Sequence, residues 1–300
     1  MRREDLFRGS LALESIMTIL FDGIAAGMLL FLISVGLSVT LGLMNFVNLA
    51  HGAFAMLGGY ACVVLLNSYG VPFLATLPAA ILVPALAGIV LERTLYRRLY
   101  AASDLDQVLF SIGLVFMSVA AAHYFFGAQQ QPLHLPEFLT GQIHLPGVDV
   151  GVYRLFLIVA GLVVALLLQW SVIRTSFGAR LRAAVDNQRV ARGMGIDVNR
   201  VFSLTFALGS ALAGLGGALG VEMLGLDPEF PVKYLVYFLI VVSVGGSGNI
   251  LGSLYAAILL GVADVAGKYY VPQIGAFIIY AVMVATLIFR PHGLFGRPHK

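Results

Sequence analysis

Two asparagines and a histidine stand out because they lie in the longest run of the chain without a charged residue. Asn45, Asn48 and His51 belong to the stretch GLMNFVNLAHGAFAMLGGY, and no Asp, Glu, Lys or Arg occurs between residues 23 and 91. Residues three apart lie close together on the surface of a helix. The spacing therefore predicts one polar stripe on an otherwise apolar helix.

The stripe has two interpretations. In lipid, polar groups must face protein or water, and hydrogen bonds between helices contribute about 0.6–2 kcal/mol each. The alternative is a translocation path lined by Asn45, Asn48, His51 and Gly52, with nearby glycines permitting a broken helix. We predict no catalytic residue, because no nucleophile is placed beside His51. We also predict no metal site, because paired cysteines and closely spaced His and carboxylate ligands are lacking.

The elements that must position these residues are transmembrane helices. Of the 300 residues, 60% are hydrophobic and only 11% are charged, too few polar groups to cover the surface of a soluble protein. A membrane-spanning helix needs about 20 apolar residues. We therefore predict an all-α, polytopic transmembrane bundle of eight or nine membrane segments, including broken or re-entrant helices. No linker interrupts residues 1–300, which predicts a single membrane domain.

Basic residues are concentrated in a few segments, which predicts the orientation of the chain. Six of the 18 Lys and Arg residues lie in 172–200, and none lies in the loop 127–152. By the positive-inside rule, 92–106, 172–200 and the C-terminus face the cytoplasm, and 127–152 faces outside. The side of the N-terminus stays open. Three crossings before residue 91 place Arg2, Arg3 and Arg8 outside, whereas two crossings and a re-entrant segment place them inside.

The cytoplasmic loop 174–200 has a helical pattern of its own. Arg182 and Asp186 are four residues apart, and Asp186 and Arg189 are three apart, spacings that favour ion pairs on one helix. Gly193 and Gly195 predict the end of that helix. The pattern indicates a short amphipathic helix that is either a surface anchor or a docking element for a partner.

Two glycine-rich stretches predict a break and a packing face. GGSGN lies between apolar runs, and glycine supplies the backbone freedom for a tight turn or hinge at Gly245, Gly246, Gly248 and Asn249. In the row from Gly209 to Gly217, small residues recur every four positions, which favours close packing of helices.

Four motifs resemble the permease subunits of bacterial ABC importers for branched-chain amino acids. They are GLSVTLGLMNFVNLAHGAFAMLGGY, SFGARLRAAVDNQRVARGMGID, VVSVGGSGNILGSLYAAILLG and RPHGLFGRP, and the likeness runs through roughly residues 16 to 298. Ala53 departs from the pattern, because relatives often have an acidic residue after NLAHG. This difference puts in doubt any solute contact that rests on that side chain.

The resemblance implies partners that the residues alone do not. Such permeases pair with a similar second permease or with themselves, are driven by two cytoplasmic ATPases, and receive solute from a periplasmic binding protein. ATP and Mg would bind the ATPase subunits, and this chain has no P-loop. The resemblance also implies the bacterial inner membrane, no nucleic-acid partner, and an ATPase-coupling element that includes Arg182, Ala183, Ala184, Asp186, Arg189 and Gly195.

Three alternative functions are compatible with parts of the sequence: import of a different solute, transport without ATPases, and hydrolysis within the membrane. Relatives of the same architecture carry urea, short amides or aromatic acids. A secondary transporter or channel would work without ATPases, and an intramembrane hydrolase would need a serine or histidine pair. The expected chemistry is therefore transport, with no enzyme activity on this chain.

Overall fold

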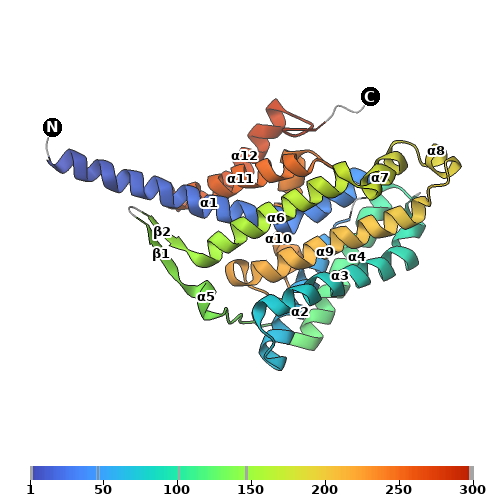
Figure 1. Ribbon diagram of the computed structural model, residues 1–300, viewed down its shortest axis with the longest axis horizontal. Coiled ribbons are helices and arrows are strands. Elements are labelled where there is room, and N and C mark those ends of the chain that lie inside the picture. Colours follow the sequence, from blue (N-terminus) through green and yellow to red (C-terminus); the bar gives the residue numbers. More distant parts are fainter. Residues whose placement is uncertain (1–2, 45, 47, 101, 146–147, 297–300) are drawn as a thin grey trace.

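The computed structural model describes residues 3–44, 46, 48–100, 102–145 and 148–296, which form a helical bundle (Figure 1). The elements are α1 (Arg3–Met44), α2 (His51–Tyr69), α3 (Phe73–Thr94), the 3-10 helix η1 (Tyr96–Leu99), α4 (Asp104–Phe126), α5 (Glu137–Thr140), β1 (Gln142–Leu145), β2 (Val148–Gly151), α6 (Val152–Arg174), α7 (Ser176–Asp186), α8 (Gln188–Gly193), α9 (Val198–Leu224), α10 (Phe230–Gly245), α11 (Ile250–Tyr270) and α12 (Gly275–Phe289).

Apolar helices dominate the described part of the chain. Seven of them are long and apolar enough to cross a membrane, and α10 and α12 are shorter apolar helices. The 16 residues of α10 give it a length of about 24 Å, less than the roughly 30 Å of a bilayer core. The predicted polytopic bundle with broken helices is confirmed, and the chain is a multi-pass membrane protein.

Helix α9 lies at the centre of the bundle, packed against α1, α2 and α3. A Cβ atom built on Gly209 would lie 2.7 Å from Thr40 Cγ2, and one on Gly216 would lie 2.7 Å from Ile33 Cα. Glycine permits this close approach because it has no side chain. The predicted packing role of the small-residue row is confirmed.

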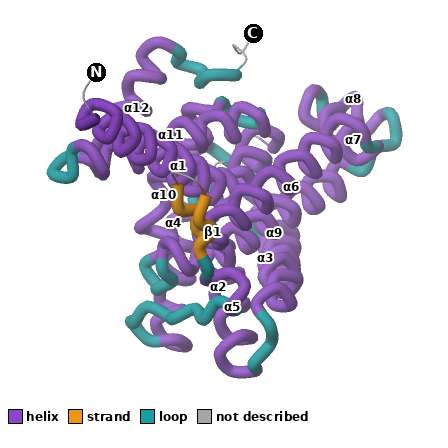
Figure 2. Tube along the Cα trace, turned by 60° about the vertical axis from the view of Figure 1, so that its left-hand side comes forward, coloured by secondary structure: helices purple, strands orange, loops and turns teal. Residues whose placement is uncertain are grey.

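The two ends of the bundle carry different structures (Figures 1 and 2). The β-hairpin lies at one end, and α7 and α8 lie at the other. Helix α1 begins at the hairpin end, where Asp22 pairs with Arg154 of α6 and Tyr269 of α11 donates to Ser15 at 3.3 Å. The start of α1 is therefore opposite α7 and α8, as three crossings require. Which end of the bundle faces the cytoplasm stays a prediction from the distribution of charge.

Between α1 and α2 the chain turns back into the bundle. The Phe46 ring contacts Tyr96 and Tyr100, just after the end of α3, with centroids 5.2 and 5.8 Å away. Ala50 packs instead against Val115 in the middle of α4. Helix α2 consequently begins beside the middle of α4. The N-terminal part of the chain therefore has three long helices, as the first alternative required, and also a re-entrant segment between α1 and α2, as the second required.

The hairpin is a small departure from the all-α expectation. β1 and β2 pair antiparallel, with Gln142 opposite Gly151, and His144 Nδ1 lies 2.6 Å from Asp149 Oδ1. Strands of four residues are too short for an alternating pattern to be distinguished from a loop.

Candidate functional site

The predicted path residues lie at a helix break and not on one helical face. α1 ends at Met44 and α2 begins at His51, while Asn45 lies outside the described residues. The expected stripe along a single helix is therefore wrong. Asn48 is the physical reason, because its Oδ1 atom accepts a hydrogen bond from the Ala50 amide at 3.1 Å. Such local bonds let asparagine favour turns over helix.

Asn48 and His51 are buried, 2% and 1% exposed, and bonded to other helices. Asn48 Oδ1 also accepts from the Tyr96 hydroxyl at 2.9 Å, and His51 Nε2 lies 2.9 Å from the Ile33 carbonyl oxygen. Within this chain the structure thus supports the first interpretation, hydrogen bonding between helices. A role in lining the path stays a prediction.

The first turns of α2 and α10 meet inside the bundle. A Cβ atom on Gly52 would lie 2.9 Å from Pro231 Cα, and the His51 and Phe238 rings are edge to face at 6.0 Å. Interrupted helices that meet inside a bundle are the arrangement from which transporters build solute sites. Gly52 is required here for contact between backbones.

The predicted turn at residues 245–249 is present. Helix α10 ends at Gly245, and Gly246 and Gly248 have φ angles of 89° and 78°, a region that favours glycine. Asn249 caps α11 by accepting a hydrogen bond from the Gly252 amide at 2.9 Å. Movement about this turn stays a prediction.

This turn packs on the end of α1, just before the break that precedes α2. The Gly248 amide donates to the Ser38 carbonyl at 3.1 Å, and the Ser253 hydroxyl donates to Ser38 Oγ at 2.8 Å. A Cβ atom on Gly42 would overlap the Gly248 backbone. The same end of α1 therefore contacts both the re-entrant segment and the glycine turn, which are some 200 residues apart in sequence.

A third break, between α9 and α10, folds back into the half of the bundle that carries the hairpin. Leu226 is 0% exposed, and a Cβ atom on Gly59 of α2 would lie 3.0 Å from it. Asp227 Oδ2 binds Lys233 Nζ at 2.6 Å. Asp227 Oδ1 and the Tyr60 hydroxyl are buried without a hydrogen-bond partner among the described residues. The sequence analysis missed this cluster, because Asp227 lies in a short gap between apolar runs that resembles an ordinary loop.

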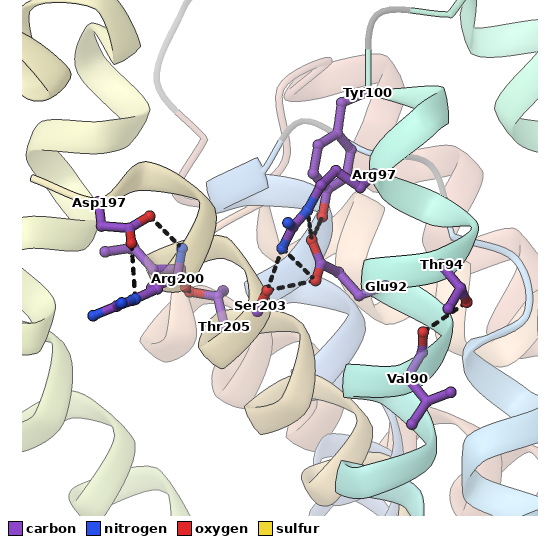
Figure 3. A network of polar contacts seen from close by, with 10 residues as sticks. Val90, Glu92, Thr94, Arg97, Tyr100, Asp197, Arg200, Ser203 and Thr205 are labelled. Atoms are coloured by element: carbon purple, nitrogen blue, oxygen red, sulfur yellow. Dashed lines mark hydrogen bonds and ion pairs between the residues drawn. The ribbon is translucent and has the colours of Figure 1, made fainter.

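Glu92 is a fully buried carboxylate at the C-terminal end of α3 (Figure 3). Ser203 of α9 donates to it at 2.5 Å and Tyr100 at 2.9 Å, while Arg97 Nη2 pairs with it at 3.3 Å. Burial, and then the charge of Glu92, raise the pKa of the Tyr100 phenol, which therefore stays a neutral donor. The cluster ties α3 and η1 to the start of α9. In the sequence, Glu92 is only the first charged residue after the uncharged run 23–91, and no pattern there predicts its burial.

The predicted amphipathic helix in 174–200 is two helices. Asn187 separates α7 from α8 with φ −155° and ψ 100°, and its side chain caps α8 by accepting from the Val190 amide at 3.0 Å. Asp186 and Arg189 therefore lie on different helices and form no ion pair. Arg182 donates to the Val172 carbonyl in place of pairing with Asp186.

One of the predicted coupling residues lies inside the protein. Ala184 is 0% exposed and Ala183 is half-buried, whereas Arg182, Asp186, Arg189 and Gly195 are exposed. Ala184 therefore anchors the element and does not form its outer surface. Gly195, with φ 81°, follows the end of α8 at Gly193, where the helix was predicted to end.

The family described as "Branched-chain amino acid transport system / permease component" matches residues 19–287. The chain belongs to this family. It is a permease component, a part of a transporter and not an enzyme.

Three relatives match most of the length of this permease. It is 27% identical over 292 residues to the high-affinity branched-chain amino acid transport system permease protein BraD of Pseudomonas aeruginosa, covering 93% of this chain and 95% of the relative. It is 28% identical over 283 residues to the probable branched-chain amino acid transport permease protein LivH of Methanocaldococcus jannaschii, covering 89% of each. It is 25% identical over 303 residues to LivM, a permease protein of the same kind from Escherichia coli, covering 89% of this chain and 68% of the relative. No solved structure matches the chain.

Three of the four motifs that resemble this family lie in contact with one another in the permease. The C-terminal RPHGLFG segment folds onto the glycine turn, where the Leu294 amide donates to the Val244 carbonyl at 2.7 Å. The Phe295 ring stacks on Tyr255 of α11 with centroids 5.5 Å apart. Three of the four motifs thus converge on one region of the bundle, which includes both the end of α1 and the turn before α11.

Proposed function

We propose that this permease is the transmembrane subunit of an ATP-driven, binding-protein-dependent importer of branched-chain amino acids in the bacterial inner membrane. It would pair with a similar permease, two cytoplasmic ATPases that bind ATP and Mg, and a periplasmic solute-binding protein. The chain matches both LivH and LivM of Escherichia coli, two similar permease proteins of one organism. This supports pairing of two similar chains.

The observation that carries this proposal is the surface of α7 and α8. Val185, Val190 and Met194 are 38%, 59% and 78% exposed, in a segment otherwise rich in arginine. The lipid-facing helices also expose apolar residues, but this segment projects beyond them at the end opposite the hairpin (Figure 1). Apolar side chains outside the bilayer favour a protein partner. An ATPase that docks here would act on the bundle through α9.

A rigid connection between this surface and the bundle supports the coupling role. Leu181 and Ala191 are 1% and 2% exposed, so both helices are anchored by buried side chains. Thr175 caps α7 by accepting from the Gly178 amide at 3.2 Å, and Asp197 caps α9 by accepting from the Arg200 amide at 3.0 Å. A displacement of α8 would therefore move the start of α9. Ser203, near that start, is hydrogen-bonded to Glu92 of α3.

Docking is tested with one variant on the surface and one away from it. In the assembled importer, we expect Val190→Asp to reduce ATPase association and uptake at least about tenfold, because it places a charge in an apolar contact. Ile143→Asp makes the same change at the hairpin, where the side chain is 41% exposed, and should leave ATPase association intact. Equal association for both variants would remove the coupling assignment.

The solute is tested by uptake into proteoliposomes that hold the permeases, ATPases, ATP and binding protein. Leucine should accumulate and compete with isoleucine and valine, while urea and an aromatic acid should not. Leaving out the ATPases should abolish accumulation, because this chain has no P-loop to power transport. Accumulation of leucine by the permease alone would refute the proposal, as would uptake of urea in place of leucine.

A further inference from the structure

We infer that Asp227, Tyr60 and Lys233 form a site in the outer half of the permease that binds the α-ammonium group of an amino acid. The inference rests on the proposed function and deepens it by naming the groups that recognise the solute. It starts from two buried polar atoms, Asp227 Oδ1 and the Tyr60 hydroxyl oxygen, which have no hydrogen-bond partner among the described residues.

Asp227 is the acidic anchor of this site. Its side chain is only 18% exposed, and Lys233 occupies Oδ2 alone. A buried carboxylate oxygen without a donor destabilises the fold, and a ligand that donates a hydrogen bond to it would offset this cost. Asp264 Oδ1 is likewise buried without a partner among the described residues, but a buried tyrosine hydroxyl in the same state accompanies only Asp227. Acidic side chains within membrane bundles commonly mark the path of a solute. The Tyr60 hydroxyl and Lys233 Nζ would complete a solute site around Asp227.

Tyr60 presents its hydroxyl from α2 toward the same place. Tyr60 is 3% exposed, and its ring stacks on Phe126 with centroids 4.0 Å apart and planes 12° apart, which fixes its direction. Leu226, the neighbour of Asp227, contacts Gly59, the neighbour of Tyr60. Among the described residues, no hydrogen bond joins the Tyr60 hydroxyl to Asp227. A ligand that donates hydrogen bonds to both oxygens would complete the two groups.

The chemistry of these groups selects an ammonium ion beside a carboxylate. An ammonium has three N–H donors, and both Asp227 Oδ1 and the Tyr60 oxygen accept. Lys233 Nζ, with its side chain 52% exposed, adds a positive charge next to Asp227 that suits the solute carboxylate. A zwitterionic amino acid meets both demands. Urea, neutral amides and acids without an amino group lack the ammonium.

The site lies where solute from the hairpin end arrives first. The chain after α4 covers it, since the Gln131 amide donates to the Leu226 carbonyl at 2.8 Å. His123 Nε2 lies 3.3 Å from Glu229 Oε1 on the same loop, and both side chains are well exposed. Glu229 is therefore an exposed carboxylate two residues from Asp227 and a matched control for it.

The test uses the complete importer with leucine-loaded binding protein. We expect Asp227→Asn to reduce leucine uptake at least about tenfold and Tyr60→Phe about three- to tenfold, the losses that follow removal of a charged and a neutral hydrogen bond. Asp227→Glu should recover part of the uptake, and Glu229→Gln should leave it within about twofold. Uptake that is unchanged by Asp227→Asn would overturn the site while leaving the proposed function standing. Absence of leucine uptake by the unsubstituted importer would instead refute the proposed function.

Two further measurements separate solute recognition from other roles. Tyr60→Phe removes an unpartnered hydroxyl, so the unfolding temperature should be unchanged or higher. A lower unfolding temperature would reveal a structural partner and overturn the assignment. The affinity of the docked binding protein for the complex should not change in Asp227→Asn. A matching loss of that affinity would show that a lysine of the binding protein supplies the ammonium, which also overturns the site.

Discussion

Replacing Glu92 by glutamine should destabilise the permease by about 3 kcal/mol. The change keeps the shape of the side chain but removes its charge. The hydroxyls of Ser203, which is buried, and Tyr100, which is half-buried, lie 2.5 and 2.9 Å away. They would then donate to a neutral acceptor, a loss of about 1 kcal/mol each. The Arg97 side chain is 36% exposed, so solvent screening limits the lost ion pair to about 1 kcal/mol.

The assay is thermal unfolding of the purified permease in lipid nanodiscs. A loss of 3 kcal/mol should lower the unfolding temperature by roughly 6–12 °C, at 2–4 °C per kcal/mol for a chain of this order of size. Glu222→Gln is the matched control, because Glu222 is an exposed carboxylate at the other end of α9, where substitutions change stability by about 0.5 kcal/mol or less. Equal unfolding temperatures for the two variants would refute the reasoning about the Glu92 cluster.

Three further predictions concern the helix breaks. The same unfolding assay checks each, and the yield of folded protein also checks Gly42→Ala. Asn48→Leu should cost about 2 kcal/mol because it leaves the buried Tyr96 hydroxyl without an acceptor; adding Tyr96→Phe should recover part of the loss, and no recovery would contradict the assigned bond. Gly42→Ala should prevent the close contact with the glycine turn and reduce the folded yield, whereas Gly113→Ala, where an added Cβ has nothing within 4 Å, should be neutral or stabilise by up to about 1 kcal/mol. Asn249→Ala should cost about 0.5–2 kcal/mol through loss of the α11 cap, and Asn249→Ser should retain most of it.

Local patterns in the sequence predicted several features correctly. The small residues from Gly209 to Gly217 predicted close packing, and GGSGN predicted the break before α11. The distribution of arginine predicted that 174–200 and 127–152 lie at opposite ends, which Figure 1 shows. Each of these depends on backbone freedom, side-chain size or charge, which are properties of a short segment.

The polar stripe failed because helical spacing describes only a helix that continues. Asn45, Asn48 and His51 are correctly spaced, but the local bond from Ala50 to Asn48 and the contact of Asn48 with Tyr96 stabilise a break. The ion pair predicted between Asp186 and Arg189 failed for a similar reason, because Asn187 ends α7 and begins α8. Arg182 and Asp186 lie on the same helix, but Arg182 donates to the Val172 carbonyl instead. A capping side chain competes with helix propagation, and tertiary contacts decide the outcome.

By itself the sequence determined that this chain is a membrane-embedded helical bundle, and its motifs indicated the permease family. Apolar length, glycine content and loop charge are local quantities that fix those answers. Only the tertiary structure decided which polar groups are already paired and which remain open. Asn48 and His51 find partners on η1 and α1, and Glu92 finds Ser203 on α9. One oxygen of Asp227 has no hydrogen-bond partner among the residues that the structure describes. Whether a buried polar group has a partner depends on segments distant in the sequence, which only folding brings together.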